Sequence, residues 1–314
     1  MIVDGPSASA ARIRARLVMD LDPGSVTTAS TGAWALGALH RLRLTWSIFS
    51  HRWGNGRNRA TLGVMCGRYA TTADPATLAV ELDALDETDH SAPVEADYNV
   101  APTTEVLTVV ERHDRENPDS DPTKRIRRMR WGLVPSWTKE LGKGPVLFNA
   151  RADSLAEKPA FRTAFKFKRC LVPMDGWYEW QTEATGGKKA AKIPYYMHPD
   201  DGSRLFMAGV WSAWRDPRVE NASPVLSCSI VTVDSLGHLE QVHDRMPLAL
   251  PRDRWEAWLD PDNTVDSALL EPVPDLFERI DVDRVRPLVN SVKNNGHELI
   301  EPDVDRAGEQ ISLL

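Results

Sequence analysis

The feature that most constrains the fold is a series of β-branched and aromatic segments separated by turn residues. They occupy residues 106–110, 169–180, 193–198, 205–211, 225–234 and 246–250. Runs of this kind, bounded by turn residues, are typical of strands. Helical patterns cover residues 74–85, 154–165, 253–259 and 274–280, but they do not alternate with the strands as βαβ units. The sequence therefore predicts an α+β fold with a mostly antiparallel, barrel-like β core and peripheral helices.

The composition is that of an ordinary globular protein. Of 314 residues, 42% are hydrophobic and 26% are charged. No apolar run reaches the roughly 18–20 residues of a membrane-spanning helix, so we expect a soluble chain. The three cysteines, Cys66, Cys170 and Cys228, lie far apart and form no CxxC pair, which argues against a disulfide framework and a structural zinc site. We expect a reducing, cytoplasmic location, and no metal or other cofactor.

The net charge of −7 is unevenly distributed along the chain. Residues 1–64 contain eight Arg and three Asp, with no Lys or Glu, whereas the remainder has 30 Lys and Arg against 42 Asp and Glu. An acidic domain binds polyanions poorly, because affinity for a nucleic-acid backbone comes from basic side chains that neutralise phosphates. Any nucleic-acid site must therefore be a local groove.

Residues 1–64 show no sustained strand or helix periodicity. Neither a secretory signal nor a transit peptide fits them well, because the apolar stretch lies too far from the start and the amphipathic pattern is weak. We expect a disordered leader that is removed or never made, with Met65 as the initiator. The predicted domain is residues 65–314.

The motif MCGRYA at residues 65–70 gives the chain a distinctive chemical option. If Cys66 becomes the first residue, its α-amine and thiol stand on adjacent carbons. Their reference pKa values, about 7.7–8.0 and about 8.5, make both nucleophiles available near neutral pH. Such a pair condenses with an aldehyde to an imine and then closes to a thiazolidine. The alternative for an isolated Cys66 is a buried, small hydrophobic residue.

Three further polar residues stand in short motifs, each with an ordinary structural alternative. Asn149, in NARADS, is either a helix cap or a site residue, and Arg151 in the same motif is either a site residue or a surface charge. Glu179, in GWYEW, is either a general acid or base in partly apolar surroundings or a strand-edge carboxylate paired with Arg. His243, in HDRMP, suits proton transfer, although a lone His is more often structural.

Basic and aromatic residues suggest contacts with a polyanion. Arg162, Lys166, Lys168 and Arg169 form a local basic cluster that is suited either to phosphates or to a solvated helix face. Trp131, in RWGLVPSW, is either a core residue or a platform for stacking bases, which contributes roughly 1–3 kcal/mol per base.

Together these motifs, with YNVAPT at 98–103 and PLVNSVKN at 287–294, resemble the SRAP family of SOS response-associated peptidases, or abasic-site processing proteins. The resemblance runs through nearly all of residues 65–294. It implies a compact α+β domain around a barrel-like sheet. It also implies that single-stranded DNA containing abasic sites is the partner, bound in a positively charged groove, and that the lesion aldehyde is trapped as a thiazolidine. We expect a monomer that associates with the nucleoid when it acts on DNA.

The resemblance also assigns roles. It implies that Cys66 supplies the amine and sulfur and that Asn149 positions the amine and the sugar oxygen. It also implies that Glu179 is the acid or base and that His243 assists proton transfer. It assigns DNA contacts to a second set of residues: Arg68, Trp131, Arg151 and Arg162. The leader departs from the family pattern, because an attached leader blocks the amine of Cys66. If the leader is made, self-cleavage between Met65 and Cys66 becomes the better account, and a thiol peptidase is the rival function.

Overall fold

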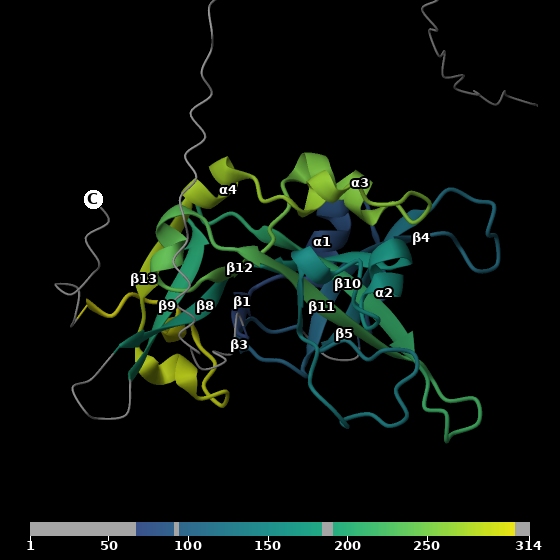
Figure 1. The fold of residues 1–314 in the computed structure, drawn as a ribbon, viewed down its shortest axis with the longest axis horizontal. Coiled ribbons are helices and arrows are strands. Elements are labelled where there is room, and N and C mark those ends of the chain that lie inside the picture. The colour runs from purple at the N-terminus through teal and green to yellow at the C-terminus, as the bar shows by residue number, and fades with distance from the viewer. Residues whose placement is uncertain (1–66, 91–93, 184–190, 305–314) are drawn as a thin grey trace, which may run out of the picture. The chain divides into compact units, whose positions relative to one another are not determined.

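The α+β prediction is confirmed by the computed structural model, which describes residues 67–90, 94–183 and 191–304. The strands form two sheets (Figure 1). The larger sheet has the order β12 (Arg245–Pro247), β11 (Val225–Asp234), β10 (Leu205–Trp214), β7 (Arg169–Met174), β4 (Glu105–Arg112), β5 (Thr123–Trp131) and β2 (Leu85–Asp86), and β6 (Asn149–Arg151) pairs with β11. The smaller sheet has the order β13 (Ile280–Arg284), β9 (Ala191–Pro199), β8 (Gly176–Glu183), β1 (Tyr69–Thr71) and β3 (Asp97–Val100).

Five strands of the larger sheet close into a barrel. β4 pairs with β5 and β7, β7 with β10, and β10 with β11, all antiparallel. A short parallel pairing of β11 with β5, at Ser227–Arg130 and Cys228–Trp131, completes the ring. The predicted barrel-like, mostly antiparallel core is therefore present.

The barrel interior is tightly packed around buried cysteines. Cys170 and Cys228 are fully buried, and a Cβ added at Gly209 on β10 would stand 2.8 Å from the Cys170 sulfur. Burial raises the pKa of both thiols, that of Cys228 to about 12, because a thiolate loses its hydration there. Both cysteines are therefore inert packing residues, as their apolar strands predict.

Short helices lie against the strands (Figure 1). α1 (Pro75–Leu82) begins as predicted, because Asp74 caps it by accepting a 2.8 Å hydrogen bond from the Thr77 amide. α2 (Arg162–Phe167) covers only the end of the predicted helix at 154–165. α3 (Trp255–Leu259) and α4 (Pro274–Glu278) lie within the ranges predicted for them.

The β-rich segment 169–180 forms two strands, β7 and β8, in different sheets. The chain leaves the barrel at Asp175 and enters the smaller sheet as β8. Asp175 makes this turn by donating its amide to the Ala70 carbonyl at 2.8 Å and accepting the Thr72 amide at 2.6 Å. Gly176 is required next, because a Cβ there would lie 2.5 Å from the Met197 carbonyl oxygen.

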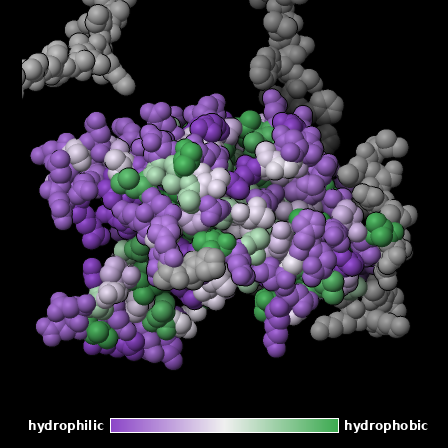
Figure 2. All heavy atoms as spheres, turned by 180° about the vertical axis from the view of Figure 1, so that it is seen from behind, coloured by the Kyte–Doolittle hydropathy of each residue, from purple (hydrophilic) through white to green (hydrophobic). Residues whose placement is uncertain are grey.

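The surface shown in Figure 2 is mostly hydrophilic, and its hydrophobic residues form small separate groups. This face therefore offers no broad apolar docking surface. In the described part of the chain, no helix is both long and apolar enough to cross a membrane.

Two neighbouring strands of the smaller sheet, β9 and β13, share a titratable pair. His198 on β9 contacts Asp283 on β13 at 3.1 Å, and the two residues lie on neighbouring strands of the smaller sheet. The hydrogen bond to Asp283 raises the pKa of His198 above its usual 6.5. Protonation is thus favoured in the folded state relative to the unfolded chain.

We predict that this pair makes the stability of the protein depend on pH. A raised histidine pKa stabilises the fold fully below the unfolded value of 6.5 and loses that contribution as pH rises through the folded value. In urea denaturation, the stability difference between wild type and His198→Gln should be larger at pH 5.5 than at pH 8.5. The same comparison in an Asp283→Asn background should lose this trend. A stability difference between wild type and His198→Gln that is independent of pH in both backgrounds would contradict the assignment.

Candidate functional site

The residue that follows Cys66 lies opposite a fully buried carboxylate. β1 pairs with β8 at Tyr69–Trp177, and the Tyr178 amide donates to the Arg68 carbonyl at 3.0 Å. One further step along this antiparallel register places Gly67 opposite Glu179. Glu179 has no exposed surface and lies on β8 between β1 and β9, so the strand-edge interpretation is wrong. Cys66 itself, like residues 1–64, lies outside the described residues.

Asn149 begins a strand rather than capping a helix. It pairs with Ile230 on β11, while Arg151 pairs with Thr232. The 3₁₀ turn that follows starts at Ala152, and its cap position is Arg151. The capping interpretation of Asn149 is therefore wrong, and its half-buried amide is placed by the parallel pairing of β6 with β11.

Trp131 joins the start of β1 to the strand that carries Asn149. Its indole is fully buried and donates from Nε1 to the Phe148 carbonyl at 2.9 Å. Edge-to-face contacts place it 5.2 Å from the Tyr69 ring and 5.9 Å from the Phe148 ring. In this structure the side chain has no surface to offer to DNA, contrary to expectation, because barrel closure turns it inward. It holds two site segments together instead.

His243 follows a 3₁₀ turn and is fixed by its own loop. Its Nδ1 accepts the Arg245 amide at 3.0 Å, so the neutral ring carries its proton on Nε2. The Asp244 carboxylate also lies 3.1 Å from Nδ1, but it is mostly exposed. The Arg245 amide N–H can only donate, so Nδ1 is the acceptor in that hydrogen bond. His243 is therefore presented with a defined tautomer.

Arg245 is a residue whose importance sequence reasoning missed, although it stands in the HDRMP motif. Its guanidinium is buried, donates a hydrogen bond to the Thr232 carbonyl at 2.7 Å and forms an ion pair with Asp234. Thr232 is also the β-ladder partner of Arg151. Arg245 thus ties the His243 loop to the strand beside β6.

A side-chain contact links the two sheets at this point. Gln181, two residues beyond Glu179 on β8, donates to the Gln241 carbonyl at 2.8 Å, and Gln241 ends the turn that leads to His243. Trp180, between Glu179 and Gln181, donates from Nε1 to Asn290 Oδ1 at 2.7 Å. The Gln181 contact holds β8 against the turn that leads to His243.

The basic residues divide into exposed and internal ones. Arg151 is exposed and pairs with Asp153 at 2.5 Å, which raises the pKa of Arg151 and lowers that of Asp153. Arg162 is exposed at the start of α2. Arg68 is half-buried and donates to Asn99 Oδ1 at 2.6 Å and to the Val289 carbonyl at 2.8 Å. Arg151 and Arg162 are therefore the expected DNA residues with the most accessible charges.

The predicted basic cluster around α2 does not hold as a unit. Arg169 is buried and donates to backbone carbonyls, including that of Trp258 at 2.6 Å and that of Lys166 at 2.7 Å. Lys168 lies over the Trp211 ring at 5.2 Å. Two of its four members are thus engaged inside the fold.

The described residues contain no group of three or more His, Cys, Asp and Glu that could hold a metal ion. What the described segments of the site supply is a buried carboxylate, a half-buried amide, an oriented imidazole and exposed arginine charge. This combination is suited to moving protons at a sugar or carbonyl oxygen beside a phosphate backbone.

Comparison with known proteins places this site in a family. The profile of the SOS response associated peptidase (SRAP) family matches residues 65–292. Abasic site processing protein YoqW of Bacillus subtilis is 34% identical over 239 residues, covering 76% of this chain and 99% of YoqW. Abasic site processing protein HMCES of Mus musculus is 32% identical over 231 residues, covering 65% of this chain and 64% of HMCES. The chain therefore belongs to the SOS response associated peptidase family.

Solved structures agree with this assignment. A protein from Bacteroides thetaiotaomicron superposes with a TM-score of 0.62 at 25% identity, covering 76% of this chain and 99% of its own. A phage-related protein from Bordetella bronchiseptica superposes with a TM-score of 0.51 at 31% identity, covering 70% and 94% of the two chains.

We predict that Trp131→Phe lowers the free energy of unfolding by about 1–3 kcal/mol, because it removes the Phe148 hydrogen bond and leaves a void beside Tyr69. Urea denaturation measures this loss. The matched control is Trp137→Phe, since Trp137 is 58% exposed and its replacement should change stability by less than about 0.5 kcal/mol. Equal effects at the two positions would contradict the role given to Trp131.

Proposed function

We propose that this protein recognises abasic sites in single-stranded DNA and forms a covalent thiazolidine crosslink with them through an N-terminal Cys66. The relatives named abasic site processing proteins support the substrate, since one aligns over 99% of its length. The observation that carries the chemistry is the pairing of β1 with β8, continued by the hydrogen bond from Tyr178 to Arg68; extended by one residue, it brings Gly67 level with the buried Glu179.

The proposed reaction joins an aminothiol to an aldehyde. The α-amine of Cys66 adds to the C1′ aldehyde of the ring-opened deoxyribose, and loss of water gives an imine. The thiol sulfur then adds to the imine carbon, while its proton passes to the nitrogen. The product is a five-membered thiazolidine and one water molecule. No internal cysteine can close this ring, because its nitrogen is part of a peptide bond.

The remaining site residues move or hold protons in this scheme. Glu179 donates a proton to the sugar ring oxygen as the ring opens and accepts it during reversal. Asn149 holds the amine and the sugar oxygen through its amide. His243, with its proton on Nε2, exchanges protons at the imine nitrogen.

The DNA backbone is proposed to be held by arginine side chains. Arg151 and Arg162 are exposed, whereas Arg68 uses one nitrogen for internal acceptors and has further N–H groups on its guanidinium. For Arg151 a phosphate would replace the carboxylate of Asp153. Trp131 is not proposed as a DNA contact.

The first test is denaturing electrophoresis of a chain that starts at Cys66, incubated with a single-stranded oligonucleotide bearing one abasic site. A band shifted by the mass of the protein is expected, and Cys66→Ala should abolish it. The matched control is a chain that starts at Val64, in which the Cys66 amine is blocked and no shifted band should form. Glu179→Gln should form the band more slowly.

The outcomes separate the candidate functions. A shifted band from a Val64 chain that intact-mass analysis shows to be uncleaved would rule out the thiazolidine. Binding of the oligonucleotide without any covalent band would make the protein a single-strand binding module. If the purified full-length chain releases residues 1–65 by itself, and Cys66→Ala abolishes that release, self-cleavage rather than initiation at Met65 is the source of the free Cys66.

A second prediction concerns the Arg151–Asp153 pair. Arg151→Gln should weaken binding to any single strand and reduce the salt slope by about 0.7, the value expected for one lost phosphate contact. Asp153→Asn should strengthen binding, because the phosphate no longer competes with a carboxylate. Fluorescence anisotropy over a series of salt concentrations measures both effects. Opposite signs for the two variants are the expected result, and weakening by both would contradict it.

A further inference from the structure

One end of the barrel interior is basic. Trp131 and Cys228 are paired and fully buried, so they face the interior, and residues two apart on a strand face the same side. Counting back along β5 in steps of two brings Arg127 and Arg125 to that interior face. Their partners on β4 are Thr108 and Val110, and two residues beyond Val110 is Arg112. The end of the barrel where β4 ends and β5 and β11 begin is therefore lined by arginines.

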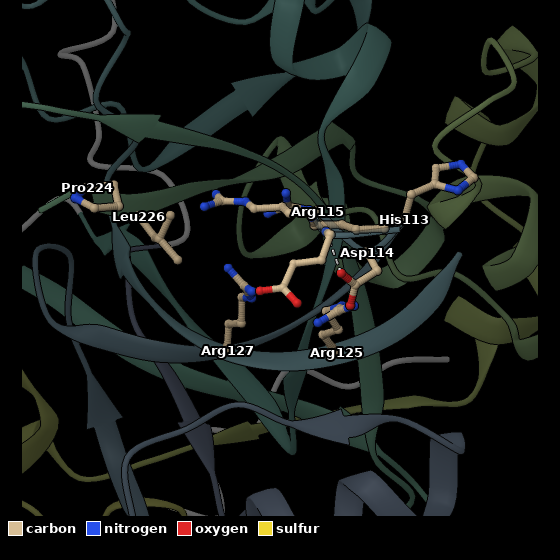
Figure 3. Close-up of a pocket in the computed structure, with 9 residues that line it drawn as sticks. His113, Asp114, Arg115, Arg125, Arg127, Pro224 and Leu226 are labelled. Atoms are coloured by element: carbon tan, nitrogen blue, oxygen red, sulfur yellow. Dashed lines mark hydrogen bonds and ion pairs between the residues drawn. The ribbon is translucent and has the colours of Figure 1, made fainter. Parts of the chain in front are cut away.

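A recess of about 350 Å³ opens at this end. It is lined by Arg112, Arg115, Arg125 and Arg127, a set that we call the arginine mouth, together with Asp114 and Leu226. Figure 3 shows Pro224 and Leu226 on one side and Asp114 on the other, with His113 pointing away. Arg112 also lies over the Trp211 ring at 5.4 Å, and Lys168 contacts the same ring.

The charges of the arginine mouth are sheltered and incompletely balanced. Arg125 and Arg127 are only 13% and 21% exposed, and both pair with Glu87, while Asp114 lies 3.4 Å from Arg125. The arginines outnumber the nearby carboxylates of Glu87, Asp114 and Glu116, and Lys168 adds a further charge. Burial lowers the pKa of Arg112, and the neighbouring Arg127, Arg115 and Arg125 add to that decrease. An anion entering the recess would relieve this repulsion.

The arginine mouth is distant from Arg151, one of the proposed DNA residues. Leu226 lies at the start of β11, whereas Thr232, the partner of Arg151, lies six residues further on. At about 3.3 Å per residue the two positions are roughly 20 Å apart along the strand. Fully buried side chains, among them Trp131 and Cys228, fill the barrel between them. The arginine mouth and the Arg151 end of β11 are thus separate regions.

We propose that the arginine mouth binds the phosphate group of a small molecule, either an inorganic phosphate or a mononucleotide. Guanidinium groups recognise such oxyanions through paired, charge-assisted hydrogen bonds. The recess is large enough for a small ligand, and barrel mouths are common ligand sites. Pro224 and Leu226 supply an apolar wall for whatever the phosphate carries.

The test is isothermal titration calorimetry of the full-length chain at low salt with three probes: inorganic phosphate, deoxyadenosine 5′-monophosphate and deoxyadenosine. The first two should bind and deoxyadenosine should not. Tighter binding of the nucleotide than of inorganic phosphate would identify a nucleotide site, and the reverse order an inorganic one. Arg127→Gln should weaken binding by about tenfold or more, as expected for a lost charge-assisted hydrogen bond.

A second variant of the arginine mouth and a matched control outside it complete the test. Arg115→Gln alters only an exposed loop residue and should also weaken binding while circular dichroism shows an intact fold. Arg279→Gln removes one charge from an exposed arginine on the smaller-sheet side and should leave binding unchanged. Absence of binding to both phosphate probes would overturn the proposal. So would binding that survives Arg127→Gln and Arg115→Gln, or binding that is lost instead in Arg151→Gln.

Discussion

The parallel pairing of β5 with β11 is the interaction on which the rest of the structure depends. It closes five strands into a barrel and turns Trp131 inward, between Tyr69 and Phe148. Beyond this pairing β11 continues alongside β6, so the same strand sets the positions of Asn149 and Arg151. Parallel neighbours require long connections. The site therefore exists only when segments about a hundred residues apart have paired.

The parts of the fold that could be predicted from sequence are those with a local pattern. Asp74 and Pro75 specify the start of α1, and the apolar run of 225–234 specifies β11. β5 was missed, because its sequence TKRIRRMRW places a basic residue at five of nine positions and hides the strand pattern. The division of 169–180 into two strands was also missed, because the chain changes sheets at Asp175 without any loss of β-forming residues on either side.

For the site, short motifs identified residue types but could not identify exposure. Trp131 and Arg169 are residue types that often contact nucleic acids. In this fold the barrel buries Trp131, and Arg169 donates hydrogen bonds to backbone carbonyls. Glu179 is the converse case. Glu179 is fully buried on a strand that lies inside the smaller sheet, a fact of tertiary structure that GWYEW alone does not contain. Which side chains a ligand can reach is decided by long-range pairing.

Arginine placement explains how an acidic domain can bind anions at all. Several arginines serve the fold itself: Arg169 and Arg245 are buried on backbone carbonyls, and Arg68 holds Asn99. Of the other arginines, Arg151 lies beside β11, and the arginine mouth lies about 20 Å away along that strand. Because a packed barrel separates these regions, occupants of the two would not compete for space. An anion in the mouth would still stabilise, by mass action, the barrel that positions Asn149.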